Sequence, residues 1–339
     1  MSMKINYIIL VICLEIVNVF KLYSQTKISD SGYPIVHLFT NYSMNFNQDK
    51  KAGFAFTRAY VGYHYNITDN LSARAIVDAA IPNSNSTKND VFLKNAFITW
   101  NSNNKKFLID GGLLCLRQFI HVQENWWGGR YINNTVTDRT GMFNGADYGF
   151  DVQYMPNSLF SFDFTFSNGE GFKSINIDNS FKYDLGITFS PSSRFVMRAV
   201  GELYSKSDEL ISESYIGDVK NQFISTLFMG YKYNKTRMGV ETAYLWNKGF
   251  IDGRNTACFS VYANSNLYKC INVLARYDKV KSYQKEDDMK NWNVTDGDLF
   301  IVGLEYIINK KLRLSPNYRW SNTLSGNVSS LFVNLEFKL

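Results

Sequence analysis

Apolar and polar residues alternate along the chain from residue 33 onward, in segments of about ten residues. In residues 159–167, phenylalanine occupies every second position, with serine, aspartate and threonine between. A period of two places successive side chains on opposite faces of a β-strand. No stripe with the helical period of 3.6 residues persists beyond a turn or two. The pattern therefore predicts strands that each have one apolar and one polar face.

Sixteen segments follow this pattern, and the connections between them alternate in length. The predicted strands lie near residues 33–47, 53–66, 70–81, 90–101, 106–115, 147–155, 159–168, 180–190, 194–204, 219–233, 236–247, 255–264, 268–279, 297–308, 311–321 and 328–339. The short connections are residues 68–70, 101–105, 156–158, 191–193, 234–235, 265–267 and 309–310. The longer ones are residues 82–89, 116–146, 169–179, 205–218, 248–254, 280–296 and 322–327.

This alternation of turn lengths favours a membrane barrel over a soluble sandwich, which shows the same apolar and polar faces. A transmembrane barrel has tight turns on one side of the membrane and long loops on the other. Nothing in the geometry of a soluble sandwich requires short and long turns to alternate. We therefore predict an all-β fold, a single transmembrane antiparallel β-barrel of about sixteen strands. Because this strand number is even, both ends of the barrel lie on the side of the tight turns.

The composition agrees with such a barrel. The 339 residues include 26 phenylalanines and 22 tyrosines, yet the mean hydropathy is slightly negative. A disordered chain lacks so many aromatic residues, and a helical membrane protein needs uncharged runs of roughly 18 apolar residues. In a barrel, aromatic side chains face lipid or ring the two membrane interfaces. Candidate interface positions are Tyr63, Tyr65, Tyr231, Tyr233, Trp246 and Trp320.

Residues 1–24 have the pattern of a secretory signal peptide. Lys4 precedes an apolar stretch over residues 7–20, and the small residue Ser24 stands where cleavage is expected. A membrane anchor is the alternative, but the stretch is too short and too polar to span a bilayer. The sequence thus predicts a signal peptide over residues 1–24 and an exported barrel over residues 25–339.

Several short segments, in this order along the chain, resemble the phosphate-selective porin O and P family. They are residues 58–63, 71–78, 138–141, 168–171, 274–278, 302–306 and 309–319. The resemblance implies a sixteen-stranded channel of a Gram-negative-type outer membrane, a homotrimer, with its third long loop folded into the lumen. That loop corresponds to residues 116–146, the longest connection in the chain. No dense series of lysines and arginines follows neighbouring strands, so the sequence itself does not predict a preference for phosphate.

If the apolar faces contact lipid, basic and acidic side chains share the lumen wall in nearly equal number. The candidate arginines are Arg58, Arg74, Arg198, Arg276, Arg313 and Arg319. Arginines on a pore wall attract permeant anions. Alternatively, they pair with carboxylates on neighbouring strands and rigidify the wall. Pairing is the favoured interpretation for most of these residues.

Residues 116–146 carry the candidate constriction. A connection of this length without structure of its own is usually functional or disordered, and Trp126-Trp127 argues against disorder. If the segment folds inward, its charged side chains lie near the narrowest point of the pore. The candidate selectivity residues are Arg117, Glu124, Arg130, Asp138 and Arg139. The alternative is that the tryptophans only pack the segment onto the wall and the charges tether it.

The sequence gives no pattern for catalysis or for a cofactor. His37, His64 and His121 have no zinc spacing and no nucleophile motif around them. The cysteines after the leader are never spaced as Cys-x-x-Cys, so we expect no metal and no disulfide framework. A formal charge of +6 is too small for this length to indicate nucleic acid.

The resulting expectation is a porin rather than an enzyme. It would let small hydrophilic solutes or ions diffuse passively across the outer membrane, with a mild anion preference, in contact with outer-membrane lipid. The alternative is a non-channel outer-membrane barrel that serves as an assembly or secretion-system partner.

Overall fold

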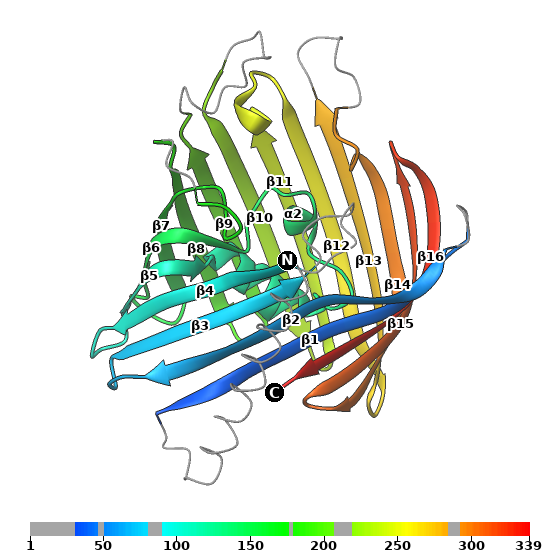
Figure 1. Ribbon diagram of the computed structural model, residues 1–339, viewed down its shortest axis with the longest axis horizontal. Helices are drawn as coiled ribbons and strands as arrows, with labels where there is room; N and C mark the ends of the chain where they lie inside the picture. The colour runs from blue at the N-terminus through cyan, green and yellow to red at the C-terminus, as the bar shows by residue number, and fades with distance from the viewer. Residues whose placement is uncertain (1–30, 47–50, 81–89, 176–178, 207–218, 284–291) are drawn as a thin grey trace, which may run out of the picture.

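The computed structural model describes residues 31–46, 51–80, 90–175, 179–206, 219–283 and 292–339. The predicted signal peptide lies outside these residues. Sixteen strands make up most of the described chain (Figure 1). They are β1 (Gly32–Asn45), β2 (Ala52–Asn66), β3 (Leu71–Ala80), β4 (Asp90–Asn101), β5 (Phe107–Cys115), β6 (Ala146–Tyr154), β7 (Phe160–Ser167), β8 (Lys182–Ser192), β9 (Phe195–Tyr204), β10 (Gln222–Tyr233), β11 (Thr236–Trp246), β12 (Asn255–Tyr268), β13 (Ile271–Tyr283), β14 (Gly297–Asn309), β15 (Leu312–Thr323) and β16 (Gly326–Lys338).

The strands close into one antiparallel barrel. Each strand pairs with its neighbours in the sequence, and β1 pairs with β16 over nine residue pairs from His37–Lys338 to Asn45–Ser330. Closure satisfies every strand edge, which a β-structure in lipid requires because no water is present there to take up free N–H and C=O groups. The predicted sixteen-stranded antiparallel barrel is confirmed.

Two predicted connections are wrong. The turn expected at residues 265–267 lies at Lys269-Cys270, because β12 continues to Tyr268. Asn266 faces this turn and its amide donates to the carbonyl oxygen of Lys269, at 2.9 Å. The long loop expected at residues 322–327 is a tight turn, since β15 and β16 stay paired up to Thr323 and Gly326. In both places polar residues that resemble a loop remain hydrogen-bonded within the sheet.

The outer surface of the barrel is apolar. On β14, Phe300, Val302 and Leu304 are exposed, as expected of side chains that face lipid. On β7 the alternation holds as the sequence predicts, with Asp163 and Thr165 buried on the opposite face from the phenylalanines. No helix among the described residues is both long and apolar enough to cross a membrane.

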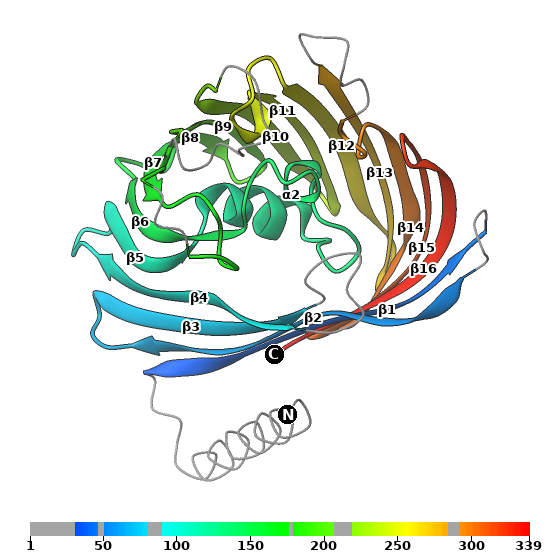
Figure 2. The ribbon, with the colours of Figure 1, turned by 45° about the horizontal axis from the view of Figure 1, so that its top comes forward.

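The chain between β5 and β6 lies within the ring of strands (Figure 2). It contains a π-helix, η1 (Phe119–Trp127), and one turn of α-helix, α2 (Val136–Arg139). We refer to residues 116–145 as the inner segment. A third short helix, η3 (Lys248–Phe250), lies between β11 and β12.

Candidate functional site

Apolar residues of the inner segment pack against three regions of the barrel wall. Val122, Trp126 and Trp127 form one buried cluster with wall residues that include Phe228 and Tyr262. A second cluster joins Tyr131 and Ile132 to Phe39, Tyr60, Ile76, Leu274, Leu299 and Ile301. A third joins Val136, Met142 and Phe143 to Val200, Ile224, Ala243, Leu245, Cys258 and Val280. Part of the inner face of the wall is thus apolar where the inner segment packs against it.

Hydrogen bonds fix the same segment to strands far from its own. Arg319 Nη2 donates to the carbonyl oxygen of Ile132 at 2.6 Å, and Asn334 Nδ2 donates to that of Tyr131 at 2.9 Å. The Tyr131 hydroxyl bonds Glu305 Oε1 at 2.9 Å. These contacts join the segment to β14, β15 and β16, whereas its own ends join β5 and β6. The segment therefore crosses the interior rather than following its neighbouring strands.

Two of the candidate constriction residues, Arg117 and Arg139, bind wall carboxylates. Arg117 bonds both Asp110 and Asp151, each at 2.6 Å, and its side chain is mostly buried. Arg139 Nη2 lies 3.3 Å from Asp278 Oδ2. Such contacts match the expectation that charges tether the segment.

Of the other three candidates, Arg130 and Asp138 line one cavity together with Phe119, and Glu124 lies beside Arg130. The Arg130 guanidinium stacks on the rings of Phe119 and Tyr60, with its central carbon 4.6 and 5.3 Å from the two ring centroids. Glu124 Oε1 lies 3.5 Å from Arg130 Nη1, and Asp138 Oδ2 accepts a hydrogen bond from Gln123 at 2.7 Å. Arg130 thus has one long ion pair and two aromatic contacts.

The candidate wall arginines are mostly paired, as the favoured interpretation expects. Arg58 pairs with Asp78, Arg276 with Asp278, and Arg313 with Glu305 and Glu336. Arg198 pairs with Asp163, and Arg319 bonds Asn317, Asn334 and the inner segment. Arg74 differs, since its buried Nε has no hydrogen-bond partner among the described residues.

His121 is held neutral on η1. Burial lowers its pKa to about 3, and the neighbouring Arg198 adds to this effect because it repels the protonated ring. His121 therefore gives the interior no charge at neutral pH. Among the described residues, no group of three or more histidine, cysteine, aspartate or glutamate side chains could hold a metal ion.

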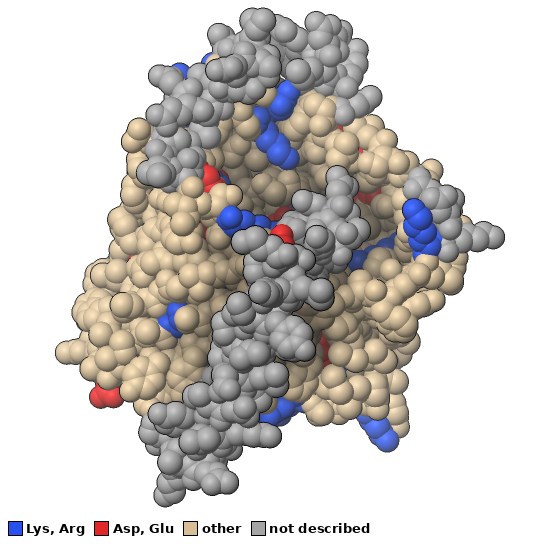
Figure 3. All heavy atoms as spheres, in the orientation of Figure 1, with Lys and Arg blue, Asp and Glu red and all other residues tan. Residues whose placement is uncertain are grey.

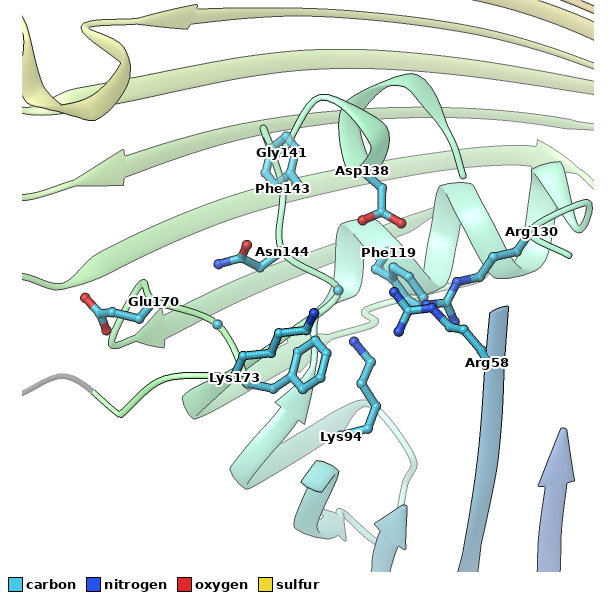
Figure 4. A pocket seen from close by; sticks show the side chains of 13 residues that line it. Arg58, Lys94, Phe119, Arg130, Asp138, Gly141, Phe143, Asn144, Glu170 and Lys173 are labelled. Atoms are coloured by element: carbon cyan, nitrogen blue, oxygen red, sulfur yellow. The ribbon is translucent and has the colours of Figure 1, made fainter. Parts of the chain in front are cut away.

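Charged side chains gather inside the barrel rather than on its flank. On the face shown in Figure 3, much of the visible Lys, Arg, Asp and Glu surface lies in the central hollow, and the surrounding flank is mostly uncharged. A cavity of about 190 Å³ lies between β2, β4, the inner segment and residues 170–173 (Figure 4). Its lining includes the basic residues Arg58, Lys94, Arg130 and Lys173, together with Asp138 and Glu170.

Lys94 was not among the sequence candidates. Strict alternation along β4 would place only one of Lys94 and Asn95 inside the barrel, yet both side chains are buried. A bulge explains this, because the register shifts between Ile76–Asn95 and Val77–Leu93 and leaves Lys94 without a partner on β3. The only sequence signal is a polar pair that breaks the alternation within a predicted strand.

No model of a known protein family matches the chain, and no curated protein matches it either. Solved structures do match. OmpT of Vibrio cholerae is 14% identical over 92% of this chain and 99% of its own, with a TM-score of 0.64. OmpF of Salmonella typhi, solved with daunomycin, is 14% identical over 91% of this chain and 97% of its own, with a TM-score of 0.67. The outer membrane channel DcaP of Acinetobacter baumannii is 12% identical over the same shares, with a TM-score of 0.64.

These likenesses establish the fold, which is that of outer-membrane porins and channels. A closed barrel with an apolar outer surface can span a bilayer because all its backbone groups are paired. The chain is accordingly an outer-membrane β-barrel.

Proposed function

We propose that the chain is a porin through which small hydrophilic solutes and ions diffuse passively across the outer membrane. The observation that carries this proposal is the closed sixteen-stranded barrel, apolar outside, whose interior holds a charged cavity beside the inner segment. The mechanism is physical rather than enzymatic. The space beside the inner segment limits solute size, and charges along the path favour one sign of ion.

The inner segment is the proposed constriction, but its charged residues differ in role. Arg117 and Arg139 form ion pairs with wall carboxylates and act as positioning residues. Arg130, which stacks on Phe119 and lies at the cavity, is the candidate selectivity residue, with Glu124 and Asp138 beside it. A mild anion preference is expected from Arg130 together with the wall cations near it.

The assembly and the closer family relationship are also proposals. A structure of the Vibrio OmpT that is described as a trimer form matches this chain with a TM-score of 0.60 at 12% identity, which supports a homotrimer of this chain in outer-membrane lipid. Membership of the phosphate-selective porin O and P family rests on the order of the short sequence segments. Phosphate specificity is not part of the proposed function.

A plugged barrel is the second candidate, and the packing of the inner segment favours it. Three apolar clusters and hydrogen bonds to Glu305 and Arg319 hold that segment to separate parts of the wall. A barrel closed in this way would serve as a partner in assembly or secretion rather than as a channel.

Single-channel conductance distinguishes an open porin from a plugged barrel. Purified protein is first shown to be folded by its altered migration on SDS gels without boiling. It is then added to a planar bilayer under a salt gradient. We expect discrete open-channel steps and a reversal potential of the sign given by anion preference. Folded protein that gives no current would overturn the porin proposal and support the plugged barrel.

A further inference from the structure

The cavity beside the inner segment brings four basic side chains together from separate parts of the chain. Arg58 comes from β2, Lys94 from β4, Arg130 from the inner segment and Lys173 from the loop after β7 (Figure 4). Pairing with carboxylates, as seen elsewhere on the wall, accounts for Arg58 and in part for Arg130. It does not account for Lys94.

Lys94 is buried without a counterion. Only 4% of its surface is exposed, and its ammonium has no ion pair or hydrogen bond with any described residue. It lies 3.8 Å from the centroid of the Phe172 ring and 5.5 Å from that of Phe119. These cation–π contacts offset only part of the cost of removing an ammonium from water. An anion in the cavity would supply the missing partner.

The charges around Lys94 add to this need. The guanidinium-bearing residues Arg58 and Arg130 line the same cavity as Lys94. The two acidic residues of the lining already accept hydrogen bonds: Asp138 from Gln123, and Glu170 from the hydroxyl of Tyr204 at 2.6 Å. Like charges that converge in a buried cavity repel one another unless an anion lies between them.

The guanidinium groups of Arg58 and Arg130 are held in place, and each keeps N–H donors that its ion pair does not use. Arg58 pairs with Asp78, which fixes its guanidinium beside the cavity. Arg130 is fixed by its two aromatic contacts, and its buried Nε has no hydrogen-bond partner among the described residues. Because each guanidinium carries five N–H donors, neither is exhausted by its one ion pair. Planar guanidinium groups match the oxygen pairs of carboxylate and phosphate.

We propose that this cavity is a binding subsite for one small oxyanion, a carboxylate or a phosphate. Lys94 forms the ion pair, Arg58 and Arg130 donate hydrogen bonds, and Lys173 adds a cation at the loop side. A volume of about 190 Å³ holds about six water molecules at roughly 30 Å³ each, which is enough for a small anion. The subsite rests on the proposed porin function for its supply of anion through the lumen.

Current measurements on the intact barrel test the subsite. Single-channel current in potassium chloride is recorded while inorganic phosphate or succinate is added in separate series. We expect at least one of the two to reduce the chloride current saturably. Replacement of Lys94 by methionine, which keeps the stem and removes the charge, should weaken this effect at least tenfold, and Lys94→Arg should largely keep it.

The matched control is Lys232→Met. This lysine also lies over an aromatic ring, with its ammonium 4.3 Å from the centroid of Trp126, but outside the cavity. Its replacement should leave the effect of the added anion unchanged. Where Lys94→Met does not give a folded barrel, Arg130→Gln removes another cation from the same cavity and serves the same comparison.

Failure of the porin proposal and failure of the subsite proposal give different results. Folded protein without any current overturns the porin proposal, and equilibrium dialysis of labelled phosphate and succinate with the detergent-folded barrel then tests the subsite alone. Current that neither anion reduces overturns the subsite, as does a reduction that is the same in wild type and Lys94→Met. A response to phosphate alone identifies a phosphate site, and a response to succinate alone identifies a carboxylate site.

Discussion

Arg198 of β9 and Asp163 of β7 form a bidentate ion pair across the intervening strand β8. Arg198 Nη1 lies 2.7 Å from Asp163 Oδ2, Nη2 lies 2.8 Å from Oδ1, and both side chains are buried. Arg198 Nε also donates to Gln118 of the inner segment at 3.0 Å. One side chain thus joins two strands of the wall to the segment that crosses the barrel.

This pair depends on a glycine. A Cβ atom at Gly186, on β8, would lie 2.4 Å from Asp163 Oδ1 and 2.7 Å from Arg198 Nη2. Gly186→Ala should therefore break the pair and lower the free energy of unfolding by about 3 kcal/mol, the scale on which a disrupted buried ion pair destabilises a protein. Urea unfolding of the detergent- or lipid-folded barrel measures this. Gly201→Ala is the control, because its Cβ would come no closer than 3.7 Å to another residue. Equal stability of the two variants would contradict the prediction.

The alternation of β7 shows what could be predicted from sequence. Its phenylalanines and polar residues separate onto two faces without help from any other part of the chain, so a local pattern suffices. On β10 and β14 the local pattern does not predict which face is inward, since Ile224 and Ile301 are apolar yet face inward against the inner segment. These apolar, inward-facing wall positions are ones that the inner segment covers. The position of the inner segment is set by tertiary contacts, which a local sequence pattern does not reveal.

The cavity is harder still to predict. Lys94 faces inward only because a bulge shifts the register by one residue, and a shift of one residue moves a side chain to the other face of a strand. The partners of the wall arginines also depend on register. Arg58 and Asp78 are 20 positions apart, and only the pairing of β2 with β3 brings them together.

Replacing Arg130 and Arg117 separately should have different effects. Arg130→Gln removes a cation from the cavity and should shift the reversal potential under a salt gradient towards cation preference. Arg117→Gln leaves Asp110 and Asp151 without their shared partner. It should lower the free energy of unfolding by about 3 kcal/mol and change the reversal potential less. Bilayer recordings and urea unfolding of both variants give the comparison. A larger change of selectivity in Arg117→Gln would reverse the assigned roles.

His121 makes folding stability depend on pH in a defined range. Its pKa is lowered to about 3 in the folded barrel, against about 6.5 in an unfolded chain. The unfolded state therefore binds more protons between these values, so stability falls as the pH drops from 6.5 towards 3 and is fully present above 6.5. Between pH 7 and pH 5 this residue should account for about 2 kcal/mol of lost stability. His121→Asn should remove that part of the pH dependence. An identical pH profile in the variant would exclude His121 as its source.

Trp127 should control how firmly the inner segment is held. Its buried ring lies 4.9 Å from that of Tyr262 between centroids, under the guanidinium of Arg276, and its indole N–H donates to the carbonyl oxygen of Asn133 at 2.6 Å. Trp127→Ala removes all three contacts and should cost about 3 to 5 kcal/mol, the range for a large buried aromatic. Those contacts hold the inner segment and not the strands. We therefore expect the ring of sixteen paired strands to stay intact and the single-channel conductance to rise. Trp127→Phe is the control, since it keeps the ring contacts and loses only the indole donor, and it should change the conductance less. A Trp127→Ala barrel with unchanged conductance would show that the segment does not limit the pore.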